Sequence, residues 1–284
     1  MSRQLHNMIQ QPDTDQAWST LHARLQADDL INTSTPKPAG RILPLFKWVV
    51  AAVLVLCLIT VAVRYILPEN AGTPLLTLQN EDVDNTLVKT LDDGSTVYLA
   101  TSSSLSYPVQ FAKDSRNVSM QGNALFDIAK NPAKPFRIET SKIIVEVLGT
   151  AFNIKTDDKG NFELSVLRGK VKVTQKVNGE TVFVTAGEQA TVIESHWQKK
   201  RYWNNTLLEG FIRNMRFKDE PLARIVQVIN QNSPRKVVLR DECIKQRKLN
   251  VRFYNSNVET MTQVISLALH LKREITQDSI FISQ

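Results

Sequence analysis

Residues 48–63 form an uncharged, largely apolar run of sixteen residues, which limits where the two flanking parts of the chain can lie. At a helical rise of about 1.5 Å per residue the run covers about 24 Å, less than the ~30 Å hydrocarbon thickness of a bilayer. Flanking apolar residues lengthen it, and Lys47 and Arg64 can snorkel their charges to the two interfaces. A buried core helix is the alternative, but such a helix seldom lacks a polar face over this length.

We therefore expect a single-pass membrane protein with a transmembrane helix over residues 48–67, which contains Trp48, Leu54 and Val63. A cleaved signal peptide does not fit, because the run starts deep in the chain and ends without a small-residue cleavage pattern. Cations are frequent just before the run, whereas none occurs between Arg64 and Lys89. The positive-inside rule then places the tail, residues 1–47, in the cytoplasm and the remainder outside.

Charge is distributed unevenly along the chain, whose net charge is +7. Residues 64–198 carry fourteen basic and sixteen acidic groups, whereas residues 199–284 carry sixteen and eight, a net charge of +8. This change in net charge predicts a domain boundary near Lys199 and an acidic partner for the last domain. The expected docking cations are Arg235, Lys236, Arg240, Lys245, Arg247 and Lys248. Nucleic acid would suit the charge, but a position outside the membrane argues against it.

The tail contains one candidate helix, about Asp15 to Leu30, with Trp18, Leu21 and Leu25 on one face. Too few apolar residues surround this stripe to form a core, so we expect it to pack on a partner protein. The alternative is a disordered tail with an incidental helix.

Residues 68–198 are predicted to form an all-β domain, a sandwich or a stacked β-coil. Short alternating apolar runs follow one another between turn signals, and glycines recur every eight to ten residues from Gly160 to Gly187. Residues 199–284 read instead as a small α+β domain with the order helix, strand, strand, helix, strand, strand. Its first helix would be capped by the sequence from Asp219 to Pro221, and its second by Asn257.

No catalytic or metal-binding constellation is recognisable in the sequence. The four histidines are scattered, and no phosphate loop, nucleophile elbow or Cys-x-x-Cys motif occurs. Cys57 and Cys243 cannot pair, because the first lies within the apolar run. Neighbouring carboxylates such as Asp92 and Asp93 lie in turns, where they commonly bond to backbone N–H groups. We therefore expect no enzyme activity, no cofactor and no metal.

The β segment contains a series of motifs that occur in order over about a hundred residues. They lie at residues 91–99, 104–108, 116–128, 135–136, 147–154, 169–173 and 186–190. With these motifs the segment resembles the iron-dicitrate sensor (FecR) family of bacterial transmembrane regulators. The segment from Trp203 resembles a small C-terminal domain found in part of that family.

This resemblance implies an anti-sigma factor in the bacterial inner membrane, with its C-terminus in the periplasm. The tail would bind an extracytoplasmic-function sigma factor through Trp18, Leu21 and Leu25. The periplasmic part would receive a signal from the signalling domain of a TonB-dependent outer-membrane transporter that takes up an iron chelate or a glycan. Intramembrane or periplasmic proteases would then release the sigma factor.

Two alternatives remain open at this stage. Some members of the family cleave themselves at a Gly-Thr bond, here Gly149-Thr150, by attack of the threonine hydroxyl on the preceding carbonyl. The other interpretation of this pair is a tight glycine turn beside a strand threonine. For the whole chain, the alternative function is a membrane-tethered protein that binds glycan or siderophore directly and has an inert tail.

Overall fold

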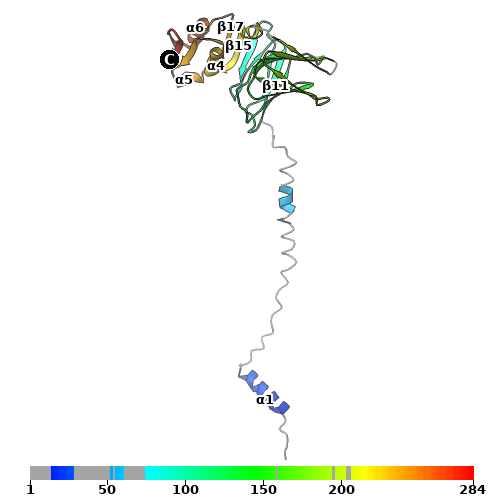
Figure 1. The fold of residues 1–284 in the computed structure, drawn as a ribbon. Helices are drawn as coiled ribbons and strands as arrows, with labels where there is room; N and C mark the ends of the chain where they lie inside the picture. The colour runs from blue at the N-terminus through cyan, green and yellow to red at the C-terminus, as the bar shows by residue number, and fades with distance from the viewer. Residues whose placement is uncertain are drawn as a thin grey trace, which may run out of the picture. The chain divides into compact units, whose positions relative to one another are not determined.

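The structure, a computed structural model, describes residues 14–28, 52–53, 55–60, 74–157, 159–193, 196–202 and 206–284. The chain divides into two compact units, residues 1–69 and residues 70–284, which we describe separately (Figure 1).

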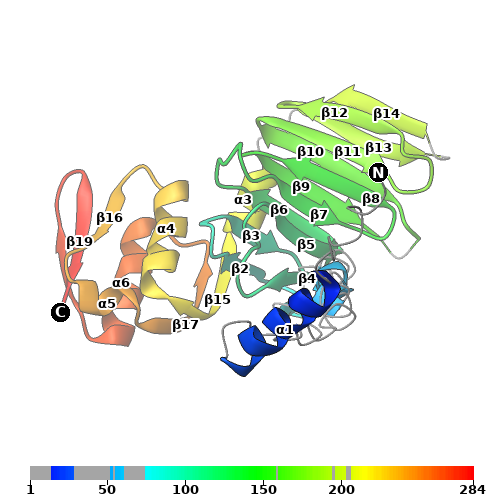
Figure 2. The same cartoon turned by 90° about the horizontal axis from the view of Figure 1, so that it is seen from below.

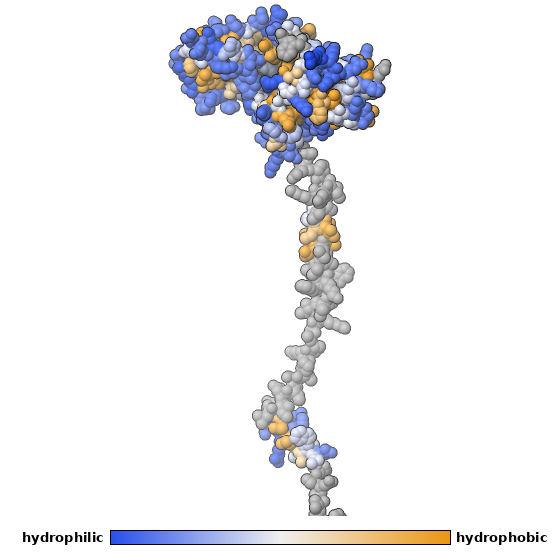
Figure 3. Space-filling view, viewed as in Figure 1, coloured by the Kyte–Doolittle hydropathy of each residue, from blue (hydrophilic) through white to orange (hydrophobic). Residues whose placement is uncertain are grey.

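The first unit contains helix α1, Thr14–Ala27, which agrees with the helix expected in the tail. Residues 52–53 and 55–60 are also helical and mostly apolar (Figure 3). No helix within the described residues is both long and apolar enough to span a membrane. Most of the predicted transmembrane segment, including Trp48, Leu54 and Val63, lies outside the described residues.

The second unit is built on two large sheets, as expected for a β-rich fold. The seven-stranded sheet has the order β1-β4-β5-β7-β8-β11-β12. Its strands are Leu75–Asn80, Ser103–Pro108, Arg116–Gln121, Phe136–Glu139, Ile143–Val147, Lys170–Gln175 and Thr181–Thr185. The nine-stranded sheet has the order β14-β13-β10-β9-β6-β3-β2-β15-β17. Its strands are His196–Arg201, Glu188–Ile193, Phe162–Arg168, Ala151–Thr156, Asn123–Asp127, Thr96–Leu99, Thr86–Thr90, Asn214–Pro221 and Lys248–Tyr254.

Alternation of apolar and polar residues explains why these strands form. In β5 the side chains alternate strictly between buried and exposed, so one face packs inward while the other meets solvent. The inward faces of the two sheets share one hydrophobic core, with Phe126, Phe136 and Phe152 fully buried. The hairpin between β2 and β3 closes at Gly94, whose φ of 84° is in the region that glycine tolerates best.

The C-terminal residues supply four helices and a three-stranded sheet around β15 and β17. These are α3 (Thr206–Ile212), α4 (Leu222–Asn232), α5 (Glu242–Lys245), α6 (Val258–Leu269), and a three-stranded sheet in the order β16-β19-β18 (Lys236–Leu239, Ser279–Ser283, Lys272–Ile275). The predicted order from α4 to β19 is confirmed, while α3, β15 and α5 were not predicted. The predicted boundary near Lys199 falls inside β14, and the predicted domain limits remain predictions.

A second hydrophobic core lies on the other face of the nine-stranded sheet. Val88, Tyr98 and Leu125, from β2, β3 and β6, pack there with α4, α6 and the three-stranded sheet. Tyr98 accepts a hydrogen bond from Asn232 Nδ2 at 2.9 Å, and burial raises the pKa of its phenol to about 12. The β segment and the C-terminal elements therefore share both a sheet and a core.

Of the two predicted helix caps, the cap of α6 is confirmed and the cap of α4 is wrong. Asn257 caps α6, and its Oδ1 accepts from the N–H of Thr260 at 2.9 Å. Asp219 does not cap α4, because the chain is still in β15 at that point and Pro221 occupies the cap position without a side-chain bond. Asp219 instead lies at a register shift of β15 with a φ of 49°.

Candidate functional site

The predicted sigma-binding side chains lie together on α1. Trp18 is 68% exposed and Leu21 47%, while Leu25 is half-buried. No residue of α1 is buried. The helix therefore presents an apolar stripe that its own unit does not cover within the described residues.

The predicted docking cations of the C-terminal segment are mostly engaged by neighbouring groups. Arg235 pairs with Glu259 at 2.5 Å, and Arg240 pairs with Glu274 at 2.8 Å and lies over the Phe281 ring. The remaining interactions are Lys245 with Glu242, Lys248 with Asp219 at 2.7 Å, and Lys236 with the carbonyls of Asn230 and Ser233. Arg247 participates through its backbone, which bonds to Ile244 and Leu222. Exposed pairs of this kind are weak, so a partner's carboxylates could compete for these cations.

The Gly149-Thr150 bond lies at the start of β9 in a tightly packed place. Gly149 has a φ of 154°, and a Cβ on it would approach the Cα of Lys130 to 2.6 Å, which only glycine avoids. Thr150 is 2% exposed, and its hydroxyl donates to the carbonyl of Lys170 at 3.2 Å. This geometry gives both residues a structural role that needs no cleavage reaction.

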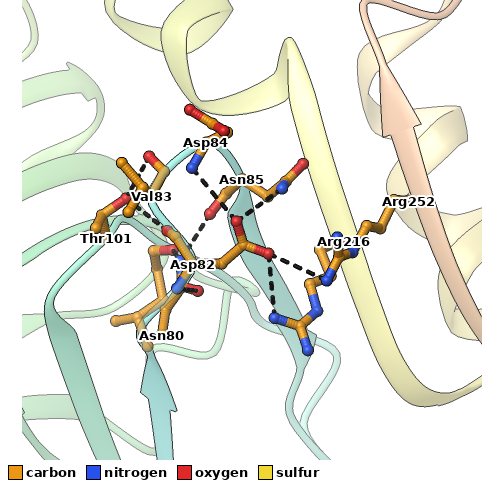
Figure 4. Close-up of polar contacts among 9 residues, drawn as sticks. Asn80, Asp82, Val83, Asp84, Asn85, Thr101, Arg216 and Arg252 are labelled. Carbon is orange, nitrogen blue, oxygen red and sulfur yellow. Dashed lines mark hydrogen bonds and ion pairs between the residues drawn. The ribbon is translucent and has the colours of Figure 1, made fainter.

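The junction between β2 and β15 brings together charged residues from distant parts of the sequence (Figure 4). Asp82, in the loop after β1, faces Arg216 of β15 and Arg252 of β17, each at 3.3 Å from its Oδ2. Its Oδ1 accepts from Asn85 Nδ2 at 2.9 Å. This hydrogen bond, with the two guanidinium groups, holds the pKa of Asp82 below its usual value. The carboxylate therefore stays charged and ties the loop to the C-terminal segment.

The rest of this loop is fixed by a buried amide. Asn80 is 1% exposed, and its Nδ2 donates to the carbonyls of Asn85 and Leu99 at 2.7 and 2.9 Å. Thr101 donates its hydroxyl to the carbonyl of Asp82 at 2.7 Å. These hydrogen bonds fix the loop in the position in which Asp82 faces the two arginines.

A second ion pair crosses the same junction but is buried. Glu220 of β15 is 1% exposed and accepts from Lys89 Nζ of β2 at 2.6 Å. Burial raises the pKa of this carboxyl, and the bond to Lys89 opposes that rise. Removing one partner of such a pair strongly destabilises the folded protein, because the other charge is then left without compensation in the interior.

An open cleft of about 470 Å³ lies beside the junction, between the β segment and α4. Asp127 and Arg168 line it as an ion pair at 2.7 Å, with Gln227 and Gln231 on the opposite side. No cluster of side chains suited to hold a metal occurs among the described residues. The lining of the cleft also includes Ile128 and Ala129, so it combines charged, amide and apolar groups.

Comparison with known sequences decides what the β segment is. Residues 82–172 match the family model described as "FecR protein". These residues form a FecR domain. The match begins at Asp82 and includes the Gly149-Thr150 pair and the motifs from residue 91 to residue 154, whereas the motif at 186–190 lies outside it. No curated protein sequence matches the chain.

Two solved structures show a limited similarity to this chain. Two crystal structures of a "putative anti-sigma factor" from Parabacteroides distasonis ATCC 8503, at 1.65 and 2.50 Å resolution, are each 22% identical with a TM-score of 0.45. The matches cover 73% and 74% of this chain and 98% and 99% of those chains.

Several residues at the junction were not singled out in the sequence. Asp82, Lys89, Arg216 and Arg252 look like ordinary surface charges, and Glu220 looks like part of a helix cap. Only the long-range pairing of β2 with β15, which are about 130 residues apart, brings them together. Local periodicity contains no signal for such a contact.

Proposed function

We propose that this protein is an anti-sigma factor that crosses the bacterial inner membrane once. Its tail holds an extracytoplasmic-function sigma factor in the cytoplasm, and its periplasmic part receives the signal from the signalling domain of a TonB-dependent outer-membrane transporter. The match of residues 82–172 to the FecR family is the observation that carries this proposal. The function is regulatory and needs neither catalysis nor a cofactor.

The exposed stripe of α1 supports sigma-factor binding. An aromatic side chain buries about 150–250 Å² in an interface. At ~25 cal/mol per Å², burial of Trp18 would then contribute roughly 4–6 kcal/mol before the costs of association. Leu21 and Leu25 extend the same face.

The shared sheet and core support transmission from the C-terminal segment to the FecR domain. β15 joins β2 directly, and α4 packs on the outer face of β2, β3 and β6. A partner that displaces the C-terminal segment must therefore act on the FecR domain as well. The C-terminal cations Arg235, Lys236, Arg240, Lys245, Arg247 and Lys248 are the candidate docking groups for the transporter's signalling domain.

Co-purification with the full-length protein tests the tail. We expect a tagged protein, extracted from its native cell in mild detergent, to recover a sigma factor that is lost in Trp18→Asp. Ala23→Asp is the matched control, because it adds the same charge on the opposite face of α1. Recovery of no sigma factor with an intact, expressed protein would favour the tethered ligand-binding alternative.

Reporter fusions test the topology independently of any partner. Alkaline phosphatase folds actively only outside the cytoplasm, so a fusion after residue 284 should be active and a fusion after residue 40 inactive. The reverse pattern would contradict the proposed orientation.

A further inference from the structure

Strand β14 is an exposed edge of the FecR-containing sheet. Its six residues, His196–Arg201, form the last strand of the nine-stranded sheet, and among the described residues the strand ladder of β14 pairs with β13 alone. One side of its backbone therefore offers a row of N–H and C=O groups over about 20 Å. Such an edge is a template for one more strand.

The edge is strongly basic. Lys199, Lys200 and Arg201 are consecutive and all exposed. Lys199 pairs with Glu188 at 3.1 Å, and Arg201 lies opposite Glu188 in the ladder. No hydrogen bond or ion pair within the described part of the chain engages the side chain of Lys200 or Arg201.

The Glu188 carboxylate offsets part of this charge. Glu188 accepts from the N–H and the hydroxyl of Thr185, and these bonds, with Lys199 nearby, hold the pKa of Glu188 below its usual value. It is therefore ionised at neutral pH but is already shared between Thr185 and Lys199. Two of the three cations remain available to a partner.

The neighbouring edge of the other sheet adds to the same surface. β12 and β14 lie at one end of the sandwich (Figure 2), and Lys199 Nζ donates to the carbonyl of Phe183 at 3.5 Å. Phe183 is 50% exposed and carries Lys170 over its ring at 4.2 Å. An incoming strand would therefore meet cations together with an aromatic side chain.

The position of the cations favours a strand over a lipid surface. Successive side chains of a strand point to opposite faces, so Lys199 and Arg201 lie on one face and Lys200 on the other. An anionic membrane would contact one face only and would leave the edge backbone without partners. Lysines on an edge commonly protect it from pairing with a second, equally basic copy. The same charges admit a strand of opposite charge.

We propose that β14 is a docking strand for an extended acidic segment of a partner protein, which adds to the nine-stranded sheet as a tenth strand. Backbone hydrogen bonds supply the affinity in this mode, and alternating carboxylates opposite the cations supply the specificity. The surface is separate from the C-terminal docking cations, and the proposal does not depend on the anti-sigma function.

Peptide binding to the full-length protein in a neutral detergent tests this proposal. The probe is a fluorescent, end-blocked octapeptide of alternating Thr and Glu, followed by anisotropy. We expect binding that weakens with salt, and roughly tenfold weaker binding to the double variant Lys200→Glu/Arg201→Glu. The matched control, Lys113→Glu/Lys218→Glu, changes the net charge equally at exposed sites elsewhere and should bind as the wild type does.

Two further measurements separate strand addition from simple charge attraction. Methylation of alternate peptide nitrogens on the edge that meets β14 should abolish binding, and the bound Thr-Glu peptide should slow hydrogen exchange of the amides of residues 196–201. Equal binding of the methylated peptide, or of a peptide of alternating Thr and Lys, would overturn the proposal. Binding of phosphatidylglycerol vesicles that depends on Lys200 and Arg201, without peptide binding, would overturn it in favour of a membrane surface. Unchanged melting temperatures verify that the variants fold.

Discussion

Arg116 is a fully buried arginine that holds three segments of the FecR domain together. Its guanidinium donates to Asp93 at 2.6 Å, in the turn between β2 and β3, and to the carbonyls of Lys134 and Ala129. It also lies over the ring of Phe136. The sequence contained Arg116 within a family motif, but a buried arginine cannot be told from a surface one by periodicity.

Truncation of Arg116 should therefore be severely destabilising. We expect Arg116→Ala to lower the free energy of unfolding by roughly 3–5 kcal/mol, since Asp93 is left without its partner and a large side chain is removed from the interior. Urea unfolding followed by circular dichroism measures this change. Arg137→Ala, one strand away and exposed, should change stability by less than ~0.5 kcal/mol. Equal effects of the two substitutions would contradict the structural role.

Glu220 should leave a signature in the pH dependence of stability. Its pKa is raised in the folded state above the usual 4.5, mainly by burial, so the folded protein binds more protons than the unfolded chain between these values. The contribution of this group to stability therefore falls as pH rises through that window. Glu220→Gln should abolish this component.

The measurement is the stability of the wild type minus that of Glu220→Gln from pH 4 to pH 8. The difference should decrease as pH rises and then level off. Carboxyls with lowered pKa values, such as Asp82 and Glu188, act in the opposite direction but equally in both proteins, so they cancel. A flat difference would show that Glu220 titrates as an exposed carboxyl does.

Among the secondary-structure elements, local sequence signals correctly predicted those strands and hairpins whose formation depends on residues close together in the chain. The alternation in β5 and the Asp93-Gly94 turn reveal strands and hairpins, because side-chain period and turn chemistry are local. β15 was missed because the stretch from Asp219 to Pro221 also fits a helix start. In the structure this stretch pairs with β2 and β17, and this pairing stabilises it as a strand.

The side-chain cap of α6 should contribute measurably to the stability of the protein. Asn257→Ala should destabilise the protein by about 1 kcal/mol, because the N–H of Thr260 loses its acceptor at the helix start. Asn257→Asp keeps a capping oxygen and should remain within a few tenths of a kcal/mol of the wild type. Thermal unfolding of both variants compares them directly. A loss in the Asp variant as large as in the Ala variant would argue against capping.

For the whole molecule, the sequence suggests a boundary between the FecR domain and the C-terminal segment, but the fold joins the two through a shared sheet and a shared core. Composition and charge change near Lys199, and the match to the family model ends at residue 172. In the fold, however, β14 crosses that point, and the second core takes Val88, Tyr98 and Leu125 from the FecR domain. Charge counts cannot reveal this, because the contacts join residues more than a hundred positions apart.

Shared packing predicts that the two parts unfold together. Ile225 of α4 is fully buried in the second core, so Ile225→Ala should cost about 2–5 kcal/mol. If β2 and β3 belong to the same cooperative unit, their amides should lose protection from hydrogen exchange by the same free energy as those of α4. Val173→Ala, in the first core on β11, serves as the reciprocal control and should lower protection in α4. Loss confined to α4 in the first variant would instead define an independently opening C-terminal segment, which could release its docking surface without disturbing the FecR domain.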